Sequence, residues 1–169
     1  MLVRGASSRR MNTPPSPRRP RSSLTPAAEI LAYVGIVPLV LCPLAIAFLP
    51  EYGQRFTAQQ VAVAYGAVVL AALGAVHWAL ALAGRLRLTI GRTLGAALPA
   101  ACGVAAVLIG GQRGLALLVV ALGVFWLYEH RGIGEELPED YLQLRRNLTL
   151  AGCFLLAIAM IISDSAGLV

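Results

Sequence analysis

His77 is the residue of this chain that most invites a chemical interpretation, because it is ionisable and lies deep within an apolar run. Counting back from Arg85 at the predicted inner boundary places it about 12 Å into the hydrocarbon of a membrane. Burial at that depth disfavours an imidazolium charge, so the ring N–H needs an acceptor. We expect that acceptor to be the carbonyl of Leu39, freed by Pro43 at the same height. We interpret His77 as a buried histidine that fixes helix packing; a proton or ligand site is the alternative, and haem ligation with His130 is the third.

A second polar group lies at Glu129, His130 and Arg131, at the end of another apolar run. The two basic residues complement a helix dipole, and Glu129 can pair with Arg131 or Arg145. We expect a solvated cluster rather than a catalytic one. The candidates for a ligand or proton site are therefore His77, Trp78, Tyr65, Glu129 and Arg145.

No constellation in the sequence matches a known reaction centre. There is no Ser/His/Asp order, P-loop, HExxH or dinucleotide fingerprint. The acidic run from 135 to 140 lacks metal-ligand spacing and is typical of a solvated loop. Cys42, Cys102 and Cys153 lie in separate apolar runs, so we expect free thiols. The sequence predicts no catalytic residue, no metal and no cofactor, and it favours a protein that is not an enzyme.

The composition indicates that the elements around these residues cross a membrane. Hydrophobic residues make up 58% of the 169 residues and charged ones only 13%, against about 25% charged residues in soluble domains. The mean hydropathy is +0.74. The net charge of +6 does not indicate nucleic-acid binding, because six of the 14 Arg lie in the first 21 residues and most others flank apolar runs.

Residues 1–24 form a separate, basic segment. They combine arginine with serine and proline and contain no acidic or aromatic residue, so they cannot bury a core. We expect a disordered cytoplasmic tail that contacts anionic lipid headgroups, at about 1 kcal/mol per arginine. A mitochondrial transit peptide is the alternative, although the prolines oppose the amphipathic helix that it requires.

Residues 25–169 are predicted to form an all-α bundle of five transmembrane helices. The first should begin at Thr25 and Pro26, as N-cap and first helical residue, and should be kinked at Pro38 and Pro43. The five predicted spans are residues 30–49, 61–83, 93–109, 115–128 and 147–163.

Local signals refine these spans. Thr57 and Gln60 have capping-box spacing ahead of the second span, in which Gly66 and Gly74 should share one packing face. The stretch 110–114 predicts a turn between antiparallel helices, and the last helix should begin at Pro138. Trp78, Trp126 and Tyr128 should anchor the bundle at the membrane interface.

Arginine positions predict the orientation. With the N-terminus inside, twelve arginines lie inside and two, Arg55 and Arg113, lie outside. This asymmetry favours an N-in, C-out protein of the bacterial cytoplasmic membrane, with the mitochondrial inner membrane as the alternative.

Short motifs in the apolar region resemble a known family. They are Ala64-Tyr65-Gly66-Ala67, Leu73-Gly74 with His77-Trp78, and Tyr141 with Leu144-Arg145 and Leu148-Thr149. Their order is similar to that of an uncharacterised family of small multi-pass proteins from bacterial inner membranes, which includes mitochondrial transmembrane protein 69. The resemblance covers about residues 30–163. It departs at Ala79, where glycine is expected, and at Glu129, where aspartate is more usual. It implies no activity.

The function that these features favour is that of a non-enzymatic accessory or assembly partner of a larger membrane complex. Glycine-containing faces, short loops and the missing catalytic constellation support it. The expected partner is another membrane protein or a second copy of the chain. The alternative is a small lipid or quinone binder, or a carrier, with a polar site around His77.

The predicted topology can be tested by reporter fusion. A periplasmic reporter joined at Val169 should be active and a cytoplasmic one silent, because an odd number of spans places the C-terminus opposite the N-terminus. The reverse pattern would overturn the five-span, N-in prediction.

Overall fold

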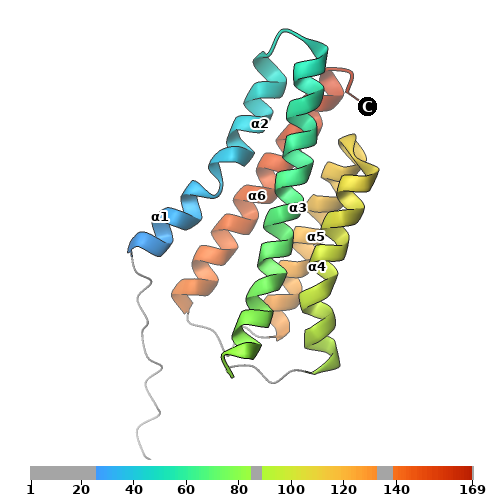
Figure 1. The fold of residues 1–169 in the computed structure, drawn as a ribbon. Coiled ribbons are helices and arrows are strands. Elements are labelled where there is room, and N and C mark those ends of the chain that lie inside the picture. Colours follow the sequence, from blue (N-terminus) through green and yellow to red (C-terminus); the bar gives the residue numbers. More distant parts are fainter. Residues whose placement is uncertain (1–25, 85–88, 133–138, 169) are drawn as a thin grey trace, which may run out of the picture.

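The structure is a computed structural model that describes residues 26–84, 89–132 and 139–168. Within these ranges the chain is all-helical and contains no strand. The helical segments are α1 (Pro26–Val34), α2 (Val37–Phe48), α3 (Tyr52–Leu82), α4 (Ile90–Ile109), α5 (Gly111–Gly132) and α6 (Glu139–Ser165) (Figure 1).

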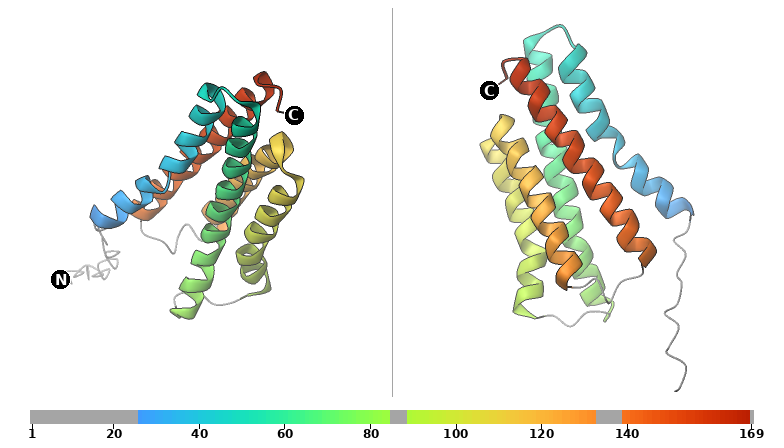
Figure 2. Two further views of the ribbon diagram at one scale, coloured as in Figure 1. Left: turned by 45° about the horizontal axis from the view of Figure 1, so that its top comes forward. Right: turned by 180° about the vertical axis from the view of Figure 1, so that it is seen from behind.

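α3 is the central element of the bundle. It contacts α2 and α6 on one side and α4 and α5 on the other, and α5 also packs on α6 (Figure 2). Fully buried aliphatic side chains from α2, α3, α5 and α6 form the core where these helices meet. They include Ile46, Leu70, Leu115, Leu118 and Leu156.

The outer surface carries many large apolar side chains, as expected of helices that face lipid. Within the part of the chain that the structure describes, four helical stretches are long and apolar enough to cross a membrane: Ile30–Phe48, Tyr52–Leu82, Gly111–Arg131 and Leu142–Ser165. These four suggest a membrane-embedded protein. The third predicted span, 93–109, corresponds to a shorter apolar stretch of α4.

The first span is bent, as predicted, but the bend lies ahead of Pro38 and Pro43, where the kinks were expected. Gly35 and Ile36 form a turn between the two helices, so that α1 and α2 meet at a bend (Figure 1). Pro38 lies in the first turn of α2, where its missing N–H costs little. Pro43 lies inside α2 without ending it. We call this bent element, residues 26–48, the α1–α2 arm.

Two local predictions were wrong. Thr57 and Gln60 do not cap a helix, because α3 already begins at Tyr52; the Thr57 hydroxyl instead donates to the Gly53 carbonyl at 2.9 Å. The turn between α4 and α5 is also tighter than 110–114, since α5 begins at Gly111. Positive φ angles at Gly110 and Gly111 allow this reversal. The proposed starts at Thr25 and Pro138 lie outside the described residues, as does the tail.

Gly66 and Gly74 are both buried at helix contacts, but they face different neighbours rather than one. A Cβ on Gly66 would lie 2.9 Å from the Leu118 side chain of α5. A Cβ on Gly74 would lie 2.5 Å from the Ala96 carbonyl of α4. The small residues therefore let α3 approach two helices at once.

Replacing Gly74 with alanine should destabilise the protein by about 1–3 kcal/mol, because the new methyl group meets backbone that cannot turn aside. The midpoint of thermal unfolding in mild detergent measures this. Gly123→Ala is the matched control, since a Cβ on that helical glycine meets nothing within 4 Å. Equal midpoints for the two variants would contradict the close α3–α4 contact.

Candidate functional site

Three ionisable side chains from three helices meet inside the bundle. His77 of α3, Glu129 of α5 and Arg145 of α6 are 5%, 5% and 6% exposed. Each lies on the buried stripe of its helix: Glu129 follows Leu122 and Phe125 at helical spacing. We call these three residues the polar cluster.

Glu129 is the centre of the polar cluster. Arg145 donates from Nε and Nη2 to the same carboxylate oxygen, Oε2, at 2.9 and 2.7 Å. The other oxygen, Oε1, lies 3.7 Å from His77 Nε2, which is too far for a hydrogen bond. His77 Nδ1 is buried and has no hydrogen-bond partner among the described residues. The carboxylate is therefore fixed by arginine on one side and only approached by histidine on the other.

Aromatic rings form the wall of the polar cluster. The Phe125 ring is 5.4 Å from the His77 ring in an edge-on arrangement, and the Arg145 guanidinium lies 5.7 Å from its centroid. Tyr128 lies 6.5 Å from the His77 ring and donates its hydroxyl to the Gly91 carbonyl at 3.1 Å. These rings keep the charges in an apolar environment, where electrostatic interactions are strong.

The structure confirms one prediction about His77 and corrects another. Its side chain points into the bundle, as expected. The predicted acceptor on Leu39 was wrong, because His77 faces α5 rather than the first helix. That prediction rested only on the similar depths of His77 and Leu39 in the membrane. The rotation of α3 about its axis turns His77 toward α5 instead.

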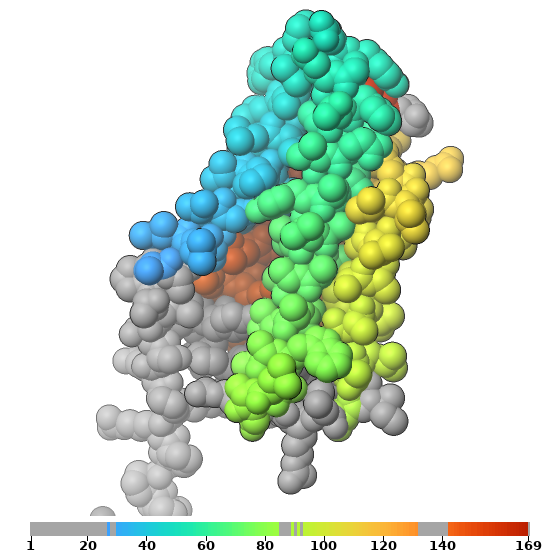
Figure 3. Space-filling view, viewed as in Figure 1, coloured from blue at the N-terminus to red at the C-terminus, as the bar shows by residue number. Residues whose placement is uncertain are grey.

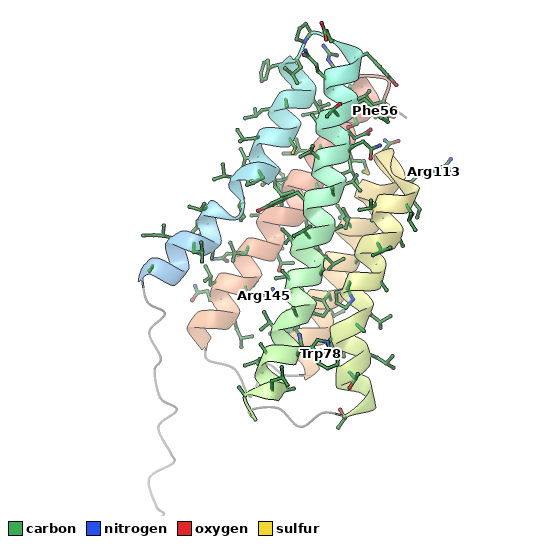
Figure 4. The ribbon with its side chains drawn as sticks, viewed as in Figure 1. Phe56, Trp78, Arg113 and Arg145 are labelled. Carbon is green, nitrogen blue, oxygen red and sulfur yellow. The ribbon has the colours of Figure 1, made fainter. Side chains whose placement is uncertain are left out.

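Glu129 pairs with Arg145, one of its two expected partners, but it is buried rather than solvated. His130 and Arg131 are exposed, and the His130 ring stacks on Trp126 at 5.5 Å. Trp78 is 44% exposed and lies outside the cluster. Figure 4 places Arg145 and Trp78 toward one end of the bundle, and Phe56 and Arg113 toward the other.

Tyr65 lies apart from the polar cluster and holds the bend of the α1–α2 arm. Its hydroxyl donates to the Gly35 carbonyl at 2.6 Å. In the α1–α2 arm, the carbonyl that accepts this side-chain hydrogen bond is thus that of Gly35 at the bend, and not that of Leu39. Because Tyr65 is on α3, the bond fixes the distance between the arm and the central helix.

Arg145 lines two cavities. One, of about 370 Å³, lies between the end of α5 and the start of α6, beside Trp126, His130 and Arg146. The other, of about 310 Å³, lies between the α1–α2 arm, α3 and α6. We call this second cavity the groove; Figure 3 shows α6 at the bottom of a hollow between the arm and α3.

Phe125 and Gly95 belong to this region and were not singled out from the sequence, and Thr149 was named only as part of a family motif. Gly95 is needed because a Cβ there would lie 2.6 Å from the Tyr128 hydroxyl. Thr149 is buried one turn beyond Arg145 and lines the groove. The helical spacing of Phe125 with Glu129, and of Arg145 with Thr149, could have revealed both inward faces.

A comparison with protein families matches residues 24–161 to a family described as "Protein of unknown function (DUF3429)". The chain belongs to this family. The match covers every motif on which the resemblance rested, and nothing in it names transmembrane protein 69. Neither the curated proteins nor the solved structures contain a significant match.

For this DUF3429 protein, breaking the buried pair on one side should be costly. Arg145→Met leaves the Glu129 carboxylate buried without its cation, and we expect a loss of about 3–5 kcal/mol in the free energy of unfolding. Arg146→Met, at the exposed neighbouring position, is the control and should change little.

The double variant Glu129→Gln/Arg145→Met completes the test. It should be more stable than the sum of the single changes predicts, since the uncompensated charge is gone. Additive losses, measured by denaturant titration in detergent, would show that the pair is not coupled.

Proposed function

We propose that this DUF3429 protein binds a lipid-like amphiphile in the groove, with the apolar chain between the α1–α2 arm and α3 and the polar group at Arg145. The observation that carries the proposal is an apolar cavity that ends at a buried guanidinium. The hydrocarbon chain of such a ligand would fill the apolar part of the cavity, and its polar group would contact the Arg145 guanidinium.

The lining of the groove supports an apolar ligand. Its side chains are mostly aliphatic and come from the α1–α2 arm, α3, α5 and α6. They include Leu31, Ile36, Leu39, Val69, Leu73 and Leu148. The volume of about 310 Å³ is near the lower end of small-molecule sites, about 300–1,000 Å³. That space suits one hydrocarbon chain better than a whole two-chain lipid.

The polar part of the groove is small and local. Of its polar side chains, Tyr65 already donates its hydroxyl to Gly35. Arg145 and Thr149 remain to meet a polar group, and they are one helical turn apart on α6. The ligand should therefore lie with its polar end toward the start of α6 and its chain toward the middle of the bundle.

The membrane arrangement belongs to the proposal. We propose that α4 is a fifth crossing, because its apolar stretch Thr93–Ile109 is about 25 Å long and packs between α3 and α5. The arginine asymmetry favours N-in orientation in a bacterial cytoplasmic membrane, in keeping with the relatives that the motifs resemble. The polar cluster and the mouth of the groove then face the cytoplasmic leaflet.

An accessory role in a larger complex stays a prediction. A helix of a partner could pack on the exposed side of α1, where Leu31 and Tyr33 are more than half exposed. Migration at monomer mass in blue-native electrophoresis, with lipid retained, would favour the amphiphile over the partner.

Ala72→Phe should block the groove. Ala72 lines it from α3 and is itself exposed, so a larger side chain can enter the cavity without disturbing the core. Labelling of the protein in nanodiscs by a photoactivatable long-chain lipid should fall at least about fivefold, a loss of roughly 1 kcal/mol in binding.

Ala75→Phe is the matched control, because Ala75 is exposed on the same helix but does not line the groove. Equal labelling of both variants, each with wild-type thermal stability, would rule out the groove as the binding site.

A further inference from the structure

Arg145 is shared between the polar cluster and the groove, and this sharing determines which ligands can bind. We infer that the groove takes an anionic amphiphile, and that its binding is accompanied by uptake of one proton between His77 and Glu129. The inference rests on the proposed function and adds the charge of the ligand and a regulating proton.

The first step concerns the charge of the polar cluster. With a neutral His77, the negative Glu129 and the positive Arg145 balance each other. An acidic head group that also contacts Arg145 brings a second negative charge into a region where all three side chains are no more than 6% exposed. Uncompensated charge is strongly disfavoured there, so a compensating proton accompanies the anion.

The second step concerns the arginine donors. Nε and Nη2 both donate to the single oxygen Oε2 of Glu129. A guanidinium has five N–H donors, so Arg145 can hold Glu129 and a second acidic group together. Because Arg145 lines the groove as well, the head group reaches it from the groove while Glu129 stays in place.

The third step identifies where the proton goes. The 3.7 Å between His77 Nε2 and Glu129 Oε1 is longer than a hydrogen bond. A proton added to Nε2 turns this approach into a charge-assisted hydrogen bond, for which about 2.7–2.9 Å is usual. Only a small shift of the ring is needed, and Oε1 is available because both hydrogen bonds from Arg145 go to Oε2.

Few other groups can take that proton. Around His77, α5 contributes Glu129 and Tyr128, and α6 contributes Arg145. On α4, Cys102 lies next to Gly103, which packs against Ala67 of α3, ten residues before His77. The other ionisable residue of α4 is Arg92, whose side chain lies outside the part of the chain that the structure describes. The Tyr128 hydroxyl is already bonded to the Gly91 carbonyl. Among the side chains that surround the pair, a histidine is the type that ordinarily exchanges a proton near neutral pH, which points to His77.

The test compares two probes of equal chain length in phosphatidylcholine nanodiscs. Hexadecanesulfonate stays anionic near neutral pH, whereas hexadecanol is neutral. Binding is measured by competition with the photoactivatable lipid, and empty nanodiscs correct for partition into the bilayer. The affinity for the sulfonate should weaken as the pH rises, by up to about tenfold per pH unit for one linked proton. The affinity for the alcohol should be independent of pH.

Variants assign the proton. His77→Gln should bind the sulfonate more weakly and without pH dependence, and should bind the alcohol like the wild type. His130→Gln is the control, because that exposed histidine stacks on Trp126 outside the polar cluster and should keep the wild-type slope. Calorimetry of the wild type in two buffers of different ionisation enthalpy should show uptake of about one proton per sulfonate, which needs no folded variant.

The outcomes separate the two proposals. If neither probe competes and Ala72→Phe behaves like Ala75→Phe, the groove itself is wrong as a binding site. If both probes compete with equal affinity at every pH, the groove holds and the anionic, proton-linked ligand is refuted. An unchanged pH slope in His77→Gln would also refute the role of His77.

Discussion

The buried ion pair between Glu129 and Arg145 is the interaction on which this half of the bundle depends. Removing both charges from water is costly, and their attraction offsets that cost only with good geometry. The geometry is good here, with two donors on one oxygen at 2.7 and 2.9 Å. Since the partners lie on α5 and α6, the pair fixes how these two helices meet, and His77 adds α3 to the same point.

Aromatic rings cover one side of the ion pair, and on another side Glu129 and Arg145 line the cavity of about 370 Å³ between α5 and α6. Tyr128 can lie beside His77 because Gly95 leaves room for its ring, and its hydroxyl is satisfied by the Gly91 carbonyl at the start of α4. Phe125 fills the space between His77 and Arg145. α4 thus contributes to the surroundings of the ion pair through Gly95 and the Gly91 carbonyl, although none of its described side chains is charged.

Much of the fold could be predicted from the sequence, because long apolar runs and proline positions report directly on helices and bends. A bend in the first span and the burial of His77 followed from such local signals, although the bend lies at Gly35 and Ile36 rather than at Pro38 and Pro43. The partner of His77 did not, because it depends on the rotation of α3 about its axis. Glu129 was assigned to solvent from its place at a helix end, although its spacing from Leu122 and Phe125 puts it on the buried stripe. Periodicity was the better guide.

The two ends of the bundle differ in a way that concerns the groove. At the end opposite the polar cluster, Gln59 donates to the Leu168 carbonyl at 3.1 Å, and α2 packs on α3 and α6. Toward the polar cluster the arm bends at Gly35 and α1 diverges from α3 (Figure 1). The helices are therefore joined at one end and spread at the other, so the groove lies where the arm leaves the bundle. The Tyr65 bond to Gly35 sets the width of that opening, which makes this hydrogen bond a structural determinant of the cavity beside Arg145.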